Sequence, residues 1–484
     1  MFRRSFVLLS SLLLLTGLVL AAPAVYAAPG PVCDHQPATY PSAPSGAVTI
    51  APGTDLSAVT RENPPGTAFW LSPGRHVLRA DQYSQISPKE GDSFLGAPGA
   101  LLDGRGVNLF AFTGQARDVS IRNLTVRGFV PPQDQGVVNH DSGDGWVIEN
   151  STIEHNGGAG LMAGARQQVR HDCLRDNGQY GMNAYADGDD IAGLVVEGNE
   201  IAGNNTDDWE HKSPGCGCSG GVKFWAVNGA DVRGNWVHGN HGPGLWADTN
   251  NNDFLIENNL IEDNDGEAVF YEISYNLVLS GNTIRRNNIV AGKARGDDFP
   301  VAAVYVSESG GEPRVPARTS SIDIHGNHFE DNWSAITLWE NADRFCNSPA
   351  NTSSGYCTLL VPHKADCAQP GIASEPLYGD CRWKTQHVQI SENTFEVSPS
   401  LCGNGLCSRM AILSNYGTYP DWSPYQGTRV QDAIVTQDNH WHDNTYGGSW
   451  TFVRGDPSHV LSPAAWQATS QDTCTSFNGG PTGC

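Results

Sequence analysis

Residues 244–264 read GLWADTNNNDFLIENNLIEDN, and residues 268–288 read AVFYEISYNLVLSGNTIRRNN. Each stretch opens with alternating apolar residues, carries a carboxylate at its fifth position, and continues to an apolar residue followed by a closing asparagine. Alternation with a period of two is typical of short β-strands and not of helices. The repetition predicts a chain that makes the same turn twice.

The same unit recurs along the middle of the chain. Its second apolar anchors are Ile153, Leu174, Ile201, Val237, Ile261, Ile284 and Phe329. Successive anchors are separated by 21, 27, 36, 24, 23 and 45 residues. A unit of this length with variable insertions indicates a β-solenoid, in which each strand pairs with its equivalents on the coils above and below. We expect the closing asparagine to take the left-handed conformation, and stacked side-chain amides to hydrogen-bond along the axis.

The regions that flank the repeat define the domain organisation. Residues 1–28 predict a secretory signal peptide, with a membrane anchor as the alternative, because arginines precede a short apolar stretch that ends in small residues. Residues 29–46 are expected to be a linker, residues 47–450 a β-helix with a Cys-rich insertion at about 345–382, and residues 451–484 a capping tail. The twelve cysteines fit an oxidising compartment and favour disulfides over a zinc site at Cys216 and Cys218.

The net charge of −23 limits the partners of this chain. It argues against nucleic acid and against an anionic membrane, and it disfavours a polyanionic substrate unless a cation intervenes. No segment after the signal peptide is apolar for long enough to cross a bilayer. We expect a monomer that binds a polysaccharide or oligosaccharide.

Several motifs resemble a known superfamily. They are TIAPGTDLSAVTRENPPGTAFWLSPGRHVL (49–78), WEHKSPGCGCSGGVKF (209–224), GLWADTNNN (244–252) and FYEISY (270–275). Over roughly residues 47–445 the chain resembles the secreted right-handed parallel β-helix proteins of the pectate-lyase-like superfamily, in particular a subgroup with a W-E, G-G-x-K, G-L-W-x-D and E-I-S pattern. The resemblance implies an all-β, single-stranded right-handed parallel β-helix with loop insertions. That superfamily includes polysaccharide lyases, glycoside hydrolases, epimerases and phage tail proteins, so the fold alone selects no activity.

Two outward columns emerge when the strand before each repeat is aligned. The third-position column contains Met162, Asn183, Lys223, Trp246, Phe270, Tyr305 and Thr337. The fifth-position column contains Gly164, Tyr185, Trp225, Asp248, Glu272, Ser307 and Trp339. Rows of exposed rings are costly unless they are used, and flat rings can stack on sugars in a groove along the coil. The predicted substrate-binding residues are therefore Tyr185, Trp225, Trp246, Phe270, Tyr305, Trp209 and Asn183.

Asp248 and Glu272 fall in one column on consecutive coils, where strands are about 4.8 Å apart. Like charges so placed raise one pKa, which is the arrangement a glycosidase needs. The spacing suits a retaining mechanism, although an inverting pair stays open. Lys223, on the preceding coil, can hold one carboxylate ionised. The alternatives are an incidental surface cluster and a calcium site in ADTNNND (247–253).

The insertion before Lys223 is expected to form a wall of the groove. It contains Trp209, Glu210 and His211, and Glu210 is a second candidate acid. Glu308 and Glu340 come one position after the outward column, so we expect turn residues there.

Three functions fit these features. The leading one is an exported glycoside hydrolase that uses Asp248 and Glu272, assisted by Lys223 and Glu210, and requires no cofactor. A polysaccharide lyase or uronate epimerase would use Lys223 as base, with calcium or an arginine to neutralise the uronate; neither outward column contains an arginine. A non-catalytic carbohydrate-binding solenoid is the third, and it needs no paired carboxylates.

Overall fold

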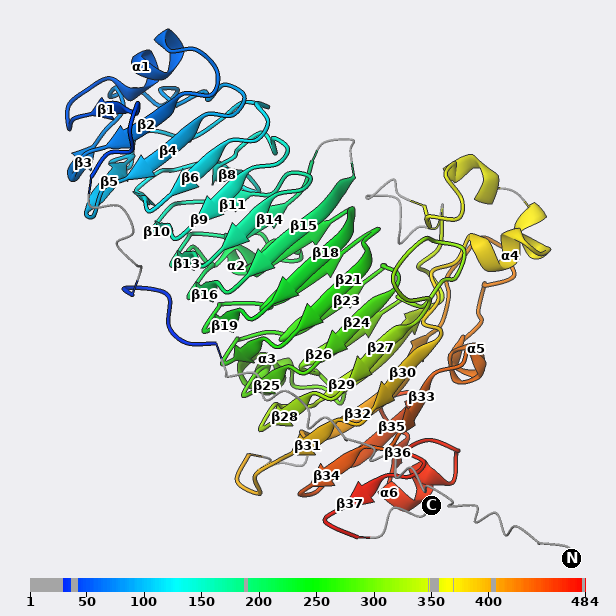
Figure 1. Cartoon of the computed structure of the whole chain (residues 1–484). Helices are drawn as coiled ribbons and strands as arrows, with labels where there is room; N and C mark the ends of the chain where they lie inside the picture. The colour runs from blue at the N-terminus through cyan, green and yellow to red at the C-terminus, as the bar shows by residue number, and fades with distance from the viewer. Residues whose placement is uncertain are drawn as a thin grey trace, which may run out of the picture.

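The computed structural model describes residues 29–35, 42–186, 190–346, 348, 357–368, 370–401, 406–480 and 484. The expected signal peptide, residues 1–28, lies outside the described residues. The chain winds into an elongated parallel β-helix, whose coils run from the N-terminal strands at one end to the C-terminal strands at the other (Figure 1). The predicted solenoid of stacked short strands is confirmed.

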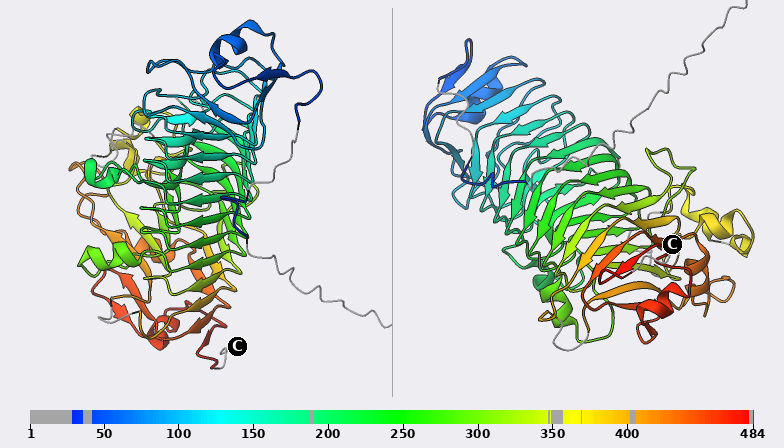
Figure 2. Two further views of the ribbon diagram at one scale, coloured as in Figure 1. Left: turned by 90° about the vertical axis from the view of Figure 1, so that its left-hand side faces the viewer. Right: turned by 60° about the horizontal axis from the view of Figure 1, so that its bottom comes forward.

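In the described part of the chain, three sheets of 13, 13 and 11 strands form the sides of the coil (Figure 2). The first sheet consists of β1 (Val48–Ile50), β2 (Ala68–Leu71), β4 (Ser93–Gly96), β6 (Ser120–Arg122), β9 (Val147–Glu149), β12 (Gln168–Arg170), β15 (Ile191–Glu197), β18 (Val227–Arg233), β21 (Asn252–Glu257), β24 (Leu277–Ser280), β27 (Ile322–His325), β30 (Val388–Ser391) and β33 (His440–His442). The second sheet consists of β3 (Gly74–His76), β5 (Ala100–Asp103), β7 (Thr125–Arg127), β10 (Thr152–Glu154), β13 (Cys173–Arg175), β16 (Glu200–Ala202), β19 (Trp236–His238), β22 (Leu260–Glu262), β25 (Thr283–Arg285), β28 (His328–Glu330), β31 (Thr394–Glu396), β34 (Thr445–Gly447) and β37 (Ser476–Phe477).

The third sheet holds the two outward columns. It consists of β8 (Gly136–Val138), β11 (Ala159–Met162), β14 (Tyr180–Ala184), β17 (Gly220–Trp225), β20 (Leu245–Asp248), β23 (Val269–Glu272), β26 (Val304–Ser307), β29 (Ile336–Asn341), β32 (Arg409–Asn415), β35 (Thr451–Gly455) and β36 (Val460–Leu461). Short helices lie at the turns and ends: α1 (Leu56–Glu62), α2 (Trp209–Lys212), α3 (Ile289–Arg295), η2 (Lys364–Cys367), η3 (Pro370–Ala373), α4 (Leu377–Asp380), α5 (Gln431–Thr436) and α6 (Pro463–Gln467).

Apolar side chains from all three sheets fill one continuous core. All seven predicted anchors belong to it: Ile153, Leu174, Ile201, Val237, Ile261, Ile284 and Phe329. Each points inward from the second sheet because side chains alternate along a strand. The core explains why the repeat tolerates insertions at its turns but keeps its anchors.

Two ladders of buried asparagines run along the coil, one on each side of the second sheet. One contains Asn199, Asn235, Asn259, Asn282, Asn327, Asn393 and Asn444, and the other contains Asn156, Asn177, Asn204, Asn240, Asn264, Asn287 and Asn332. Each amide donates to the next, as Asn259 does to Asn282 at 3.0 Å, so the predicted stacking is confirmed. The expected left-handed conformation is wrong for the closing asparagine. It is the preceding residue that turns, for example Asp263 (φ 55°) before Asn264.

The ends of the coil differ from the predicted boundaries. β35 joins the third sheet and β37 joins the second, so the coil continues past residue 450, where the sequence predicted a separate capping tail. α6 then buries Trp466 against Phe452, with the rings 5.1 Å apart. At the other end, α1 lies across the first coils (Figure 1).

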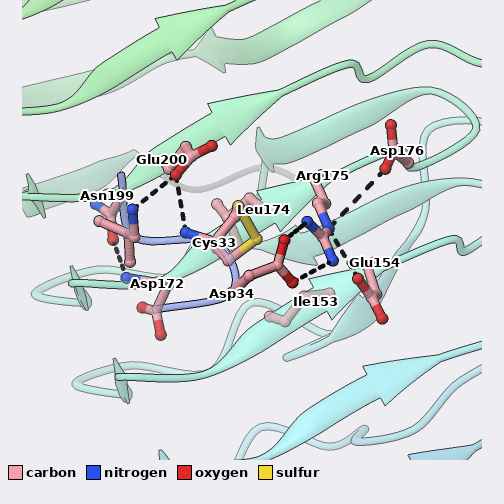
Figure 3. Close-up of a disulfide and its surroundings, with 12 residues drawn as sticks. Cys33, Asp34, Ile153, Glu154, Asp172, Leu174, Arg175, Asp176, Asn199 and Glu200 are labelled. Carbon is pink, nitrogen blue, oxygen red and sulfur yellow. Dashed lines mark hydrogen bonds and ion pairs between the residues drawn. A yellow bond between two sulfur atoms is a disulfide. The ribbon is translucent and has the colours of Figure 1, made fainter. Parts of the chain in front are cut away.

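Residues 32–35, expected to be part of a linker, are fastened to the flank of the coil. Cys33 forms a disulfide with Cys173 in the second sheet. The backbone N–H of Cys33 donates to Glu200 at 2.8 Å, and Asp34 forms an ion pair with Arg175 at 2.8 Å (Figure 3). We call residues 32–35 the N-terminal clip.

The Cys-rich insertion follows β29 and is a small packed unit. Disulfides join Cys346 to Cys357 and Cys367 to Cys381. Phe345 packs there against Tyr419 and Tyr425 from a later loop. The insertion projects from the side of the coil (Figure 1).

Candidate active site on the third sheet

Asp248 and Glu272 lie on neighbouring coils of the third sheet. The register pairs Ala247 with Tyr271, so the two carboxylate residues that follow occupy the same rung. Ala247 and Tyr271 are buried in the core. Alternation therefore turns the side chains of Asp248 and Glu272 to the outer face, where each keeps 13% of its side chain exposed.

Lys223 holds Asp248 from the preceding coil. Its ammonium lies 3.0 Å from the Asp248 carboxylate and 4.3 Å from the centre of the Trp246 ring. It also donates to the carbonyl oxygen of Gly217. The hydroxyl of Thr249 donates to the same carboxylate at 2.8 Å. Asp248 is thus an ion-paired carboxylate in a fixed position.

Glu272 is in a different electrostatic environment. The indole N–H of Trp246 lies 3.3 Å from one carboxyl oxygen, and the Arg344 guanidinium lies 3.3 Å from the other. Burial, and next the negative charge of Asp248, raise the pKa of Glu272 to about 8, although Arg344 and Lys223 oppose the rise. The Glu272 carboxyl is therefore protonated at neutral pH, while its neighbour Asp248 is ion-paired with Lys223.

Two charged members of this site, Arg344 and Glu308, were not predicted from the repeat. Arg344, from the loop after β29, contacts Glu272 and lies 3.6 Å from the carboxylate of Glu308. Glu308 is fully buried, accepts a hydrogen bond from Ser307, and has a left-handed backbone with φ 45°. Burial raises the pKa of the Glu308 carboxyl. The expectation of a simple turn residue is therefore incomplete for Glu308. Neither outward column contains an arginine, but Arg344 reaches the pair from a loop, so the expected lack of an arginine at the site is wrong.

Glu340, the other expected turn residue, does not join the site. It is buried at the end of β29 and forms an ion pair with Arg382 at 2.6 Å. The backbone N–H of Thr385 donates to it at 2.8 Å. Glu340 therefore fastens the Cys-rich insertion to the coil.

The rings of the third-position column stack on one another. Trp246 and Phe270 lie 5.1 Å apart, and Phe270 and Tyr305 lie 4.9 Å apart. Phe299, from the segment after α3, packs edge-on against Tyr305. Only 8% of Trp246 is exposed. These rings form a wall of the site instead of an open row.

The other predicted sugar-binding residues lie in two environments. Asn183 is 4% exposed and its amide donates to the carbonyl oxygen of Asp134 at 3.0 Å, which corrects the expectation of an exposed amide. Tyr185 is 39% exposed and lies edge-on to Trp225, 6.4 Å away. Trp209, in the insertion loop, packs against the cluster that contains Tyr180. Tyr185 is therefore an exposed ring of the predicted set, and Trp225 lies half-buried beside it.

The loop that contains α2 covers Trp246 without bringing its acid to the pair. The Glu210 carboxylate is exposed and accepts from the backbone N–H of Gly215 at 3.0 Å. Cys216 and Cys218 form a disulfide, and between them Gly217 lies on the Trp246 ring. The structure thus places the loop as predicted but leaves Glu210 apart from Asp248 and Glu272.

Two cavities flank the carboxylate pair along the third sheet. The first, of about 720 Å³, lies at the ends of β8, β11 and β14 and is lined by Tyr185. The second, of about 660 Å³, lies between α2 and α3 and is lined by Glu210, Trp246 and Phe270. Tyr185 connects the first cavity to the pair through Trp225, and Trp246 is shared by the second cavity and the pair.

Several polar groups of residues 247–253, where calcium is the alternative, already have partners within the protein, and the calcium site itself stays a prediction. Asp253 forms an ion pair with Arg318 at 2.9 Å. The Asn251 amide donates to the carbonyl oxygen of Asp248 at 2.7 Å and accepts from the backbone of Val227. Within the described ranges, no group of three or more His, Cys, Asp or Glu side chains is placed to hold a metal ion.

Residues 112–313 match the family model described as the right handed beta helix region. The chain folds as a right-handed parallel β-helix, whereas the pectate-lyase-like superfamily and its narrower subgroup stay predictions. No curated protein matches the chain at a significant level of sequence similarity. Among the helices of the described residues, none is long and apolar enough to cross a membrane.

Several solved structures are similar in shape. The A-module of mannuronan C-5 epimerase AlgE4 from Azotobacter vinelandii is 13% identical, with a TM-score of 0.49 over 83% of this chain and 90% of that one. The catalytic unit of a GH87 α-1,3-glucanase from Streptomyces thermodiastaticus is 13% identical, with a TM-score of 0.46 over 86% and 71%. A mannuronic acid specific family 6 lyase from human gut microbiota is 11% identical, with a TM-score of 0.45 over 83% and 86%. With identities this low, the activity of this chain has to come from its own side chains.

Proposed function

We propose that the protein is an exported glycoside hydrolase that acts on a polysaccharide through Asp248 and Glu272. The observation that carries the proposal is the electrostatic difference between these neighbours: one carboxylate is held by Lys223 at 3.0 Å, while the pKa of the other is raised to about 8. A glycosidase needs one protonated and one ionised carboxyl group at the scissile bond.

The environments assign the roles. Glu272 is the general acid, because it keeps its proton at neutral pH and can give it to the leaving oxygen. Asp248 acts on the opposite side of the sugar, as nucleophile or as the base that activates water. Trp246 orients both groups, since its N–H contacts Glu272 and its ring face contacts Lys223. Tyr185 and Trp225 offer ring surfaces to the flanking sugars.

Export is part of the proposal. Disulfides in the described residues join Cys33 to Cys173, Cys216 to Cys218, Cys346 to Cys357, Cys367 to Cys381 and Cys474 to Cys484. Such bonds form and persist in oxidising compartments. The N-terminal 28 residues, interpreted as a signal peptide, would direct the chain there.

Arg344 makes a uronate lyase the second candidate. An arginine beside a lysine could neutralise a uronate carboxylate while Lys223 takes the proton. However, Lys223 is paired with Asp248, and Arg344 is shared by Glu272 and Glu308. Both cations therefore already have acid partners, and neither is left free for a uronate carboxylate, which favours the hydrolase.

A glycan panel tests the proposal. The full-length secreted protein is incubated with plant and microbial polysaccharides, and products are followed by released reducing ends and by ultraviolet absorbance. A hydrolase releases reducing ends without an absorbing product, whereas a lyase forms an unsaturated sugar that absorbs.

Asp248→Asn should abolish product release yet retain the bound glycan, and the matched control Glu257→Gln, on the first sheet of the same coil, should behave as wild type. Equal activity in wild type and Asp248→Asn would reject the assignment. Binding without any product, unchanged by Asp248→Asn, would instead identify a carbohydrate-binding solenoid.

A further inference from the structure

The first cavity, of about 720 Å³, has no part in the proposed hydrolysis, and Tyr185, which lines it, lies two coils before Asp248. Tyr185 lines it and is 39% exposed, and the ring of Trp225 lies 6.4 Å further along the column. Trp225 pairs in register with Asp248. A polymer that reaches the carboxylate pair can therefore continue over these two rings into the cavity.

The charged side chains that line this cavity are mostly negative. Its acidic residues are Asp134, Asp141, Asp144 and Asp190. Among the described side chains that line it, Arg117 is the one arginine or lysine. Asp144 has a basic neighbour outside the cavity, Arg166 at 3.5 Å. Asp134 is bonded instead to the uncharged amide of Gln179 at 2.7 Å.

His140 does not compensate Asp141. Their closest atoms are 3.9 Å apart. Burial lowers the pKa of His140, although the charge of Asp141 opposes this. The imidazole is therefore neutral at pH 7, and the charge of Asp141 is left facing the cavity.

The second cavity, of about 660 Å³ on the other side of Trp246, repeats this charge pattern. Its acids are Asp208, Glu210, Asp265 and Glu267. No lysine or arginine is among its described lining residues; the basic side chains there are His211, at 2.7 Å from Asp208, and His241, at 3.0 Å from Asp265. Both ends of the groove are thus negative, while Lys223 and Arg344 at the centre are already paired with acids.

We infer that the groove binds a glycan whose sugars carry free amino groups. The inference rests on the proposed function and names the substrate class of the same site. Ammonium groups on successive sugars would meet Asp134, Asp141 and Asp190 in the first cavity, while the sugar rings lie on Tyr185 and Trp225. A polyuronate of the same shape would bring its carboxylates against these aspartates, and like charges at such distances repel.

The test compares matched polymers. Binding of the full-length Glu272→Gln variant is measured by calorimetry and affinity electrophoresis with β- and α-linked glucosamine and galactosamine oligomers, with the same oligomers after N-acetylation, with neutral glucans, and with polyuronates. The expected result is binding to a free-amine oligomer that exceeds binding to its acetylated form by about tenfold or more and weakens with salt. Preference for an acetylated, neutral or uronate polymer, or failure of every free-amine oligomer to bind, overturns the inference.

A charge variant separates the cavity from the net charge of the protein. Asp134→Asn, Asp141→Asn and Asp190→Asn together should weaken binding of the free-amine oligomer about tenfold at low salt and leave neutral oligomers unaffected. The control carries Asp366→Asn, Asp421→Asn and Glu392→Gln, which remove the same charge from exposed residues that line neither cavity. Equal weakening in both triple variants overturns the inference.

Turnover distinguishes this inference from the proposed function. If the wild type hydrolyses a neutral glycan in an Asp248-dependent way and ignores amino glycans, the hydrolase stands and the amino-sugar inference falls. If an amino glycan binds through the three aspartates but no product forms, the inference about the ligand stands and the hydrolase falls.

Discussion

The asparagine ladders and the carboxylate column both place polar side chains between neighbouring coils, with opposite consequences. In the ladders each amide is donor and acceptor at once, so Asn259 accepts from Asn235 and donates to Asn282 at 2.9 and 3.0 Å. In the column, Asp248 and Glu272 are both acceptors when ionised, and cations from other coils must separate them.

The comparison shows which polar stack supports the fold and which supports a site. A self-complementary stack can extend over any number of coils at no electrostatic cost. A stack of like charges holds only if one member is protonated or paired, as Glu272 and Asp248 are. Local conflicts of this kind concentrate at functional sites.

The largest effect is expected when the column loses its proton donor. Glu272→Gln keeps the shape of the side chain, and kcat should fall about 10³-fold. Because the pKa of Glu272 is about 8, the wild-type rate should decline tenfold per pH unit above about pH 8. The variant should lack this limb in a kcat/KM profile measured from pH 5 to pH 10. If kcat/KM of the variant still declines above about pH 8, a group other than Glu272 is the proton donor.

The same variant should change how the free energy of unfolding depends on pH. The folded pKa of Glu272 is raised above its value of 4.5, so the folded state holds the proton more tightly than the unfolded state. Wild-type stability should therefore fall as pH rises from about 4.5 to 8, and Glu272→Gln should flatten this slope in urea unfolding. An identical slope in both proteins contradicts the assignment.

Breaking a ladder should affect stability and not chemistry. Asn259→Ala removes a buried amide and leaves the carbonyl oxygen of Val232 and the backbone N–H of Asn235 without their partner, for a loss of about 3 kcal/mol in the free energy of unfolding. The folded variant should keep wild-type kcat. Asn258→Gly, at the adjacent left-handed position, should cost only a few tenths of a kcal/mol. Reduced kcat in folded Asn259→Ala would show that the two stacks are coupled.

Removing the cation between the coils sharpens the assignment of Asp248. Lys223→Met should lower kcat about 10²-fold, because Asp248 loses its ion partner. Lys223 also lowers the pKa of Glu272, so the basic limb should move to higher pH. Lys212→Met, which removes a lysine from the neighbouring loop, should leave both unchanged. A lowered kcat with an unmoved limb would mean that Lys223 acts away from Glu272.

The smallest effect is expected at the loop over Trp246. A Cβ on Gly217 would lie 3.0 Å from the ring, at φ +58°. Gly215, in the same loop, has φ +76° and open space around it. Both alanine variants should lose about 1 kcal/mol of stability, but only Gly217→Ala should also lower kcat, by a few fold, through displacement of Trp246. Equal kcat values for Gly217→Ala and Gly215→Ala would show that the loop has no role in the site.

The sequence was sufficient for the features that repeat. Anchors such as Ile261, the two outward columns and the rung shared by Asp248 and Glu272 all follow from a period of two inside a recurring unit. Arg344 lies in a loop outside the repeat and contacts Glu272, which is 72 residues away in the sequence, so no periodic pattern predicts the contact. The place of Glu308 in the site was not predicted, because its left-handed backbone interrupts the strand alternation on which the prediction depended.

The repeating pattern also did not predict that the aromatic rings of the third-position column are covered. The third-position column is outward as predicted, but the segment that carries Phe299 covers Tyr305. Which loop folds over which column depends on packing that no period records. Disulfide partners are similar, since Cys33 and Cys173 are 140 residues apart and twelve cysteines allow many pairings.

The N-terminal clip has a consequence for how the molecule comes apart. A stack in which each coil touches only its neighbours frays from its ends. The Cys33–Cys173 bond closes a covalent ring around the first coils, and a ring of this size disfavours the opened chain by about 4 to 5 kcal/mol. In the oxidised protein, the C-terminal coils should therefore unfold first and exchange their amide hydrogens fastest. Once a reductant opens the ring, the coils next to α1 should become the fastest to exchange.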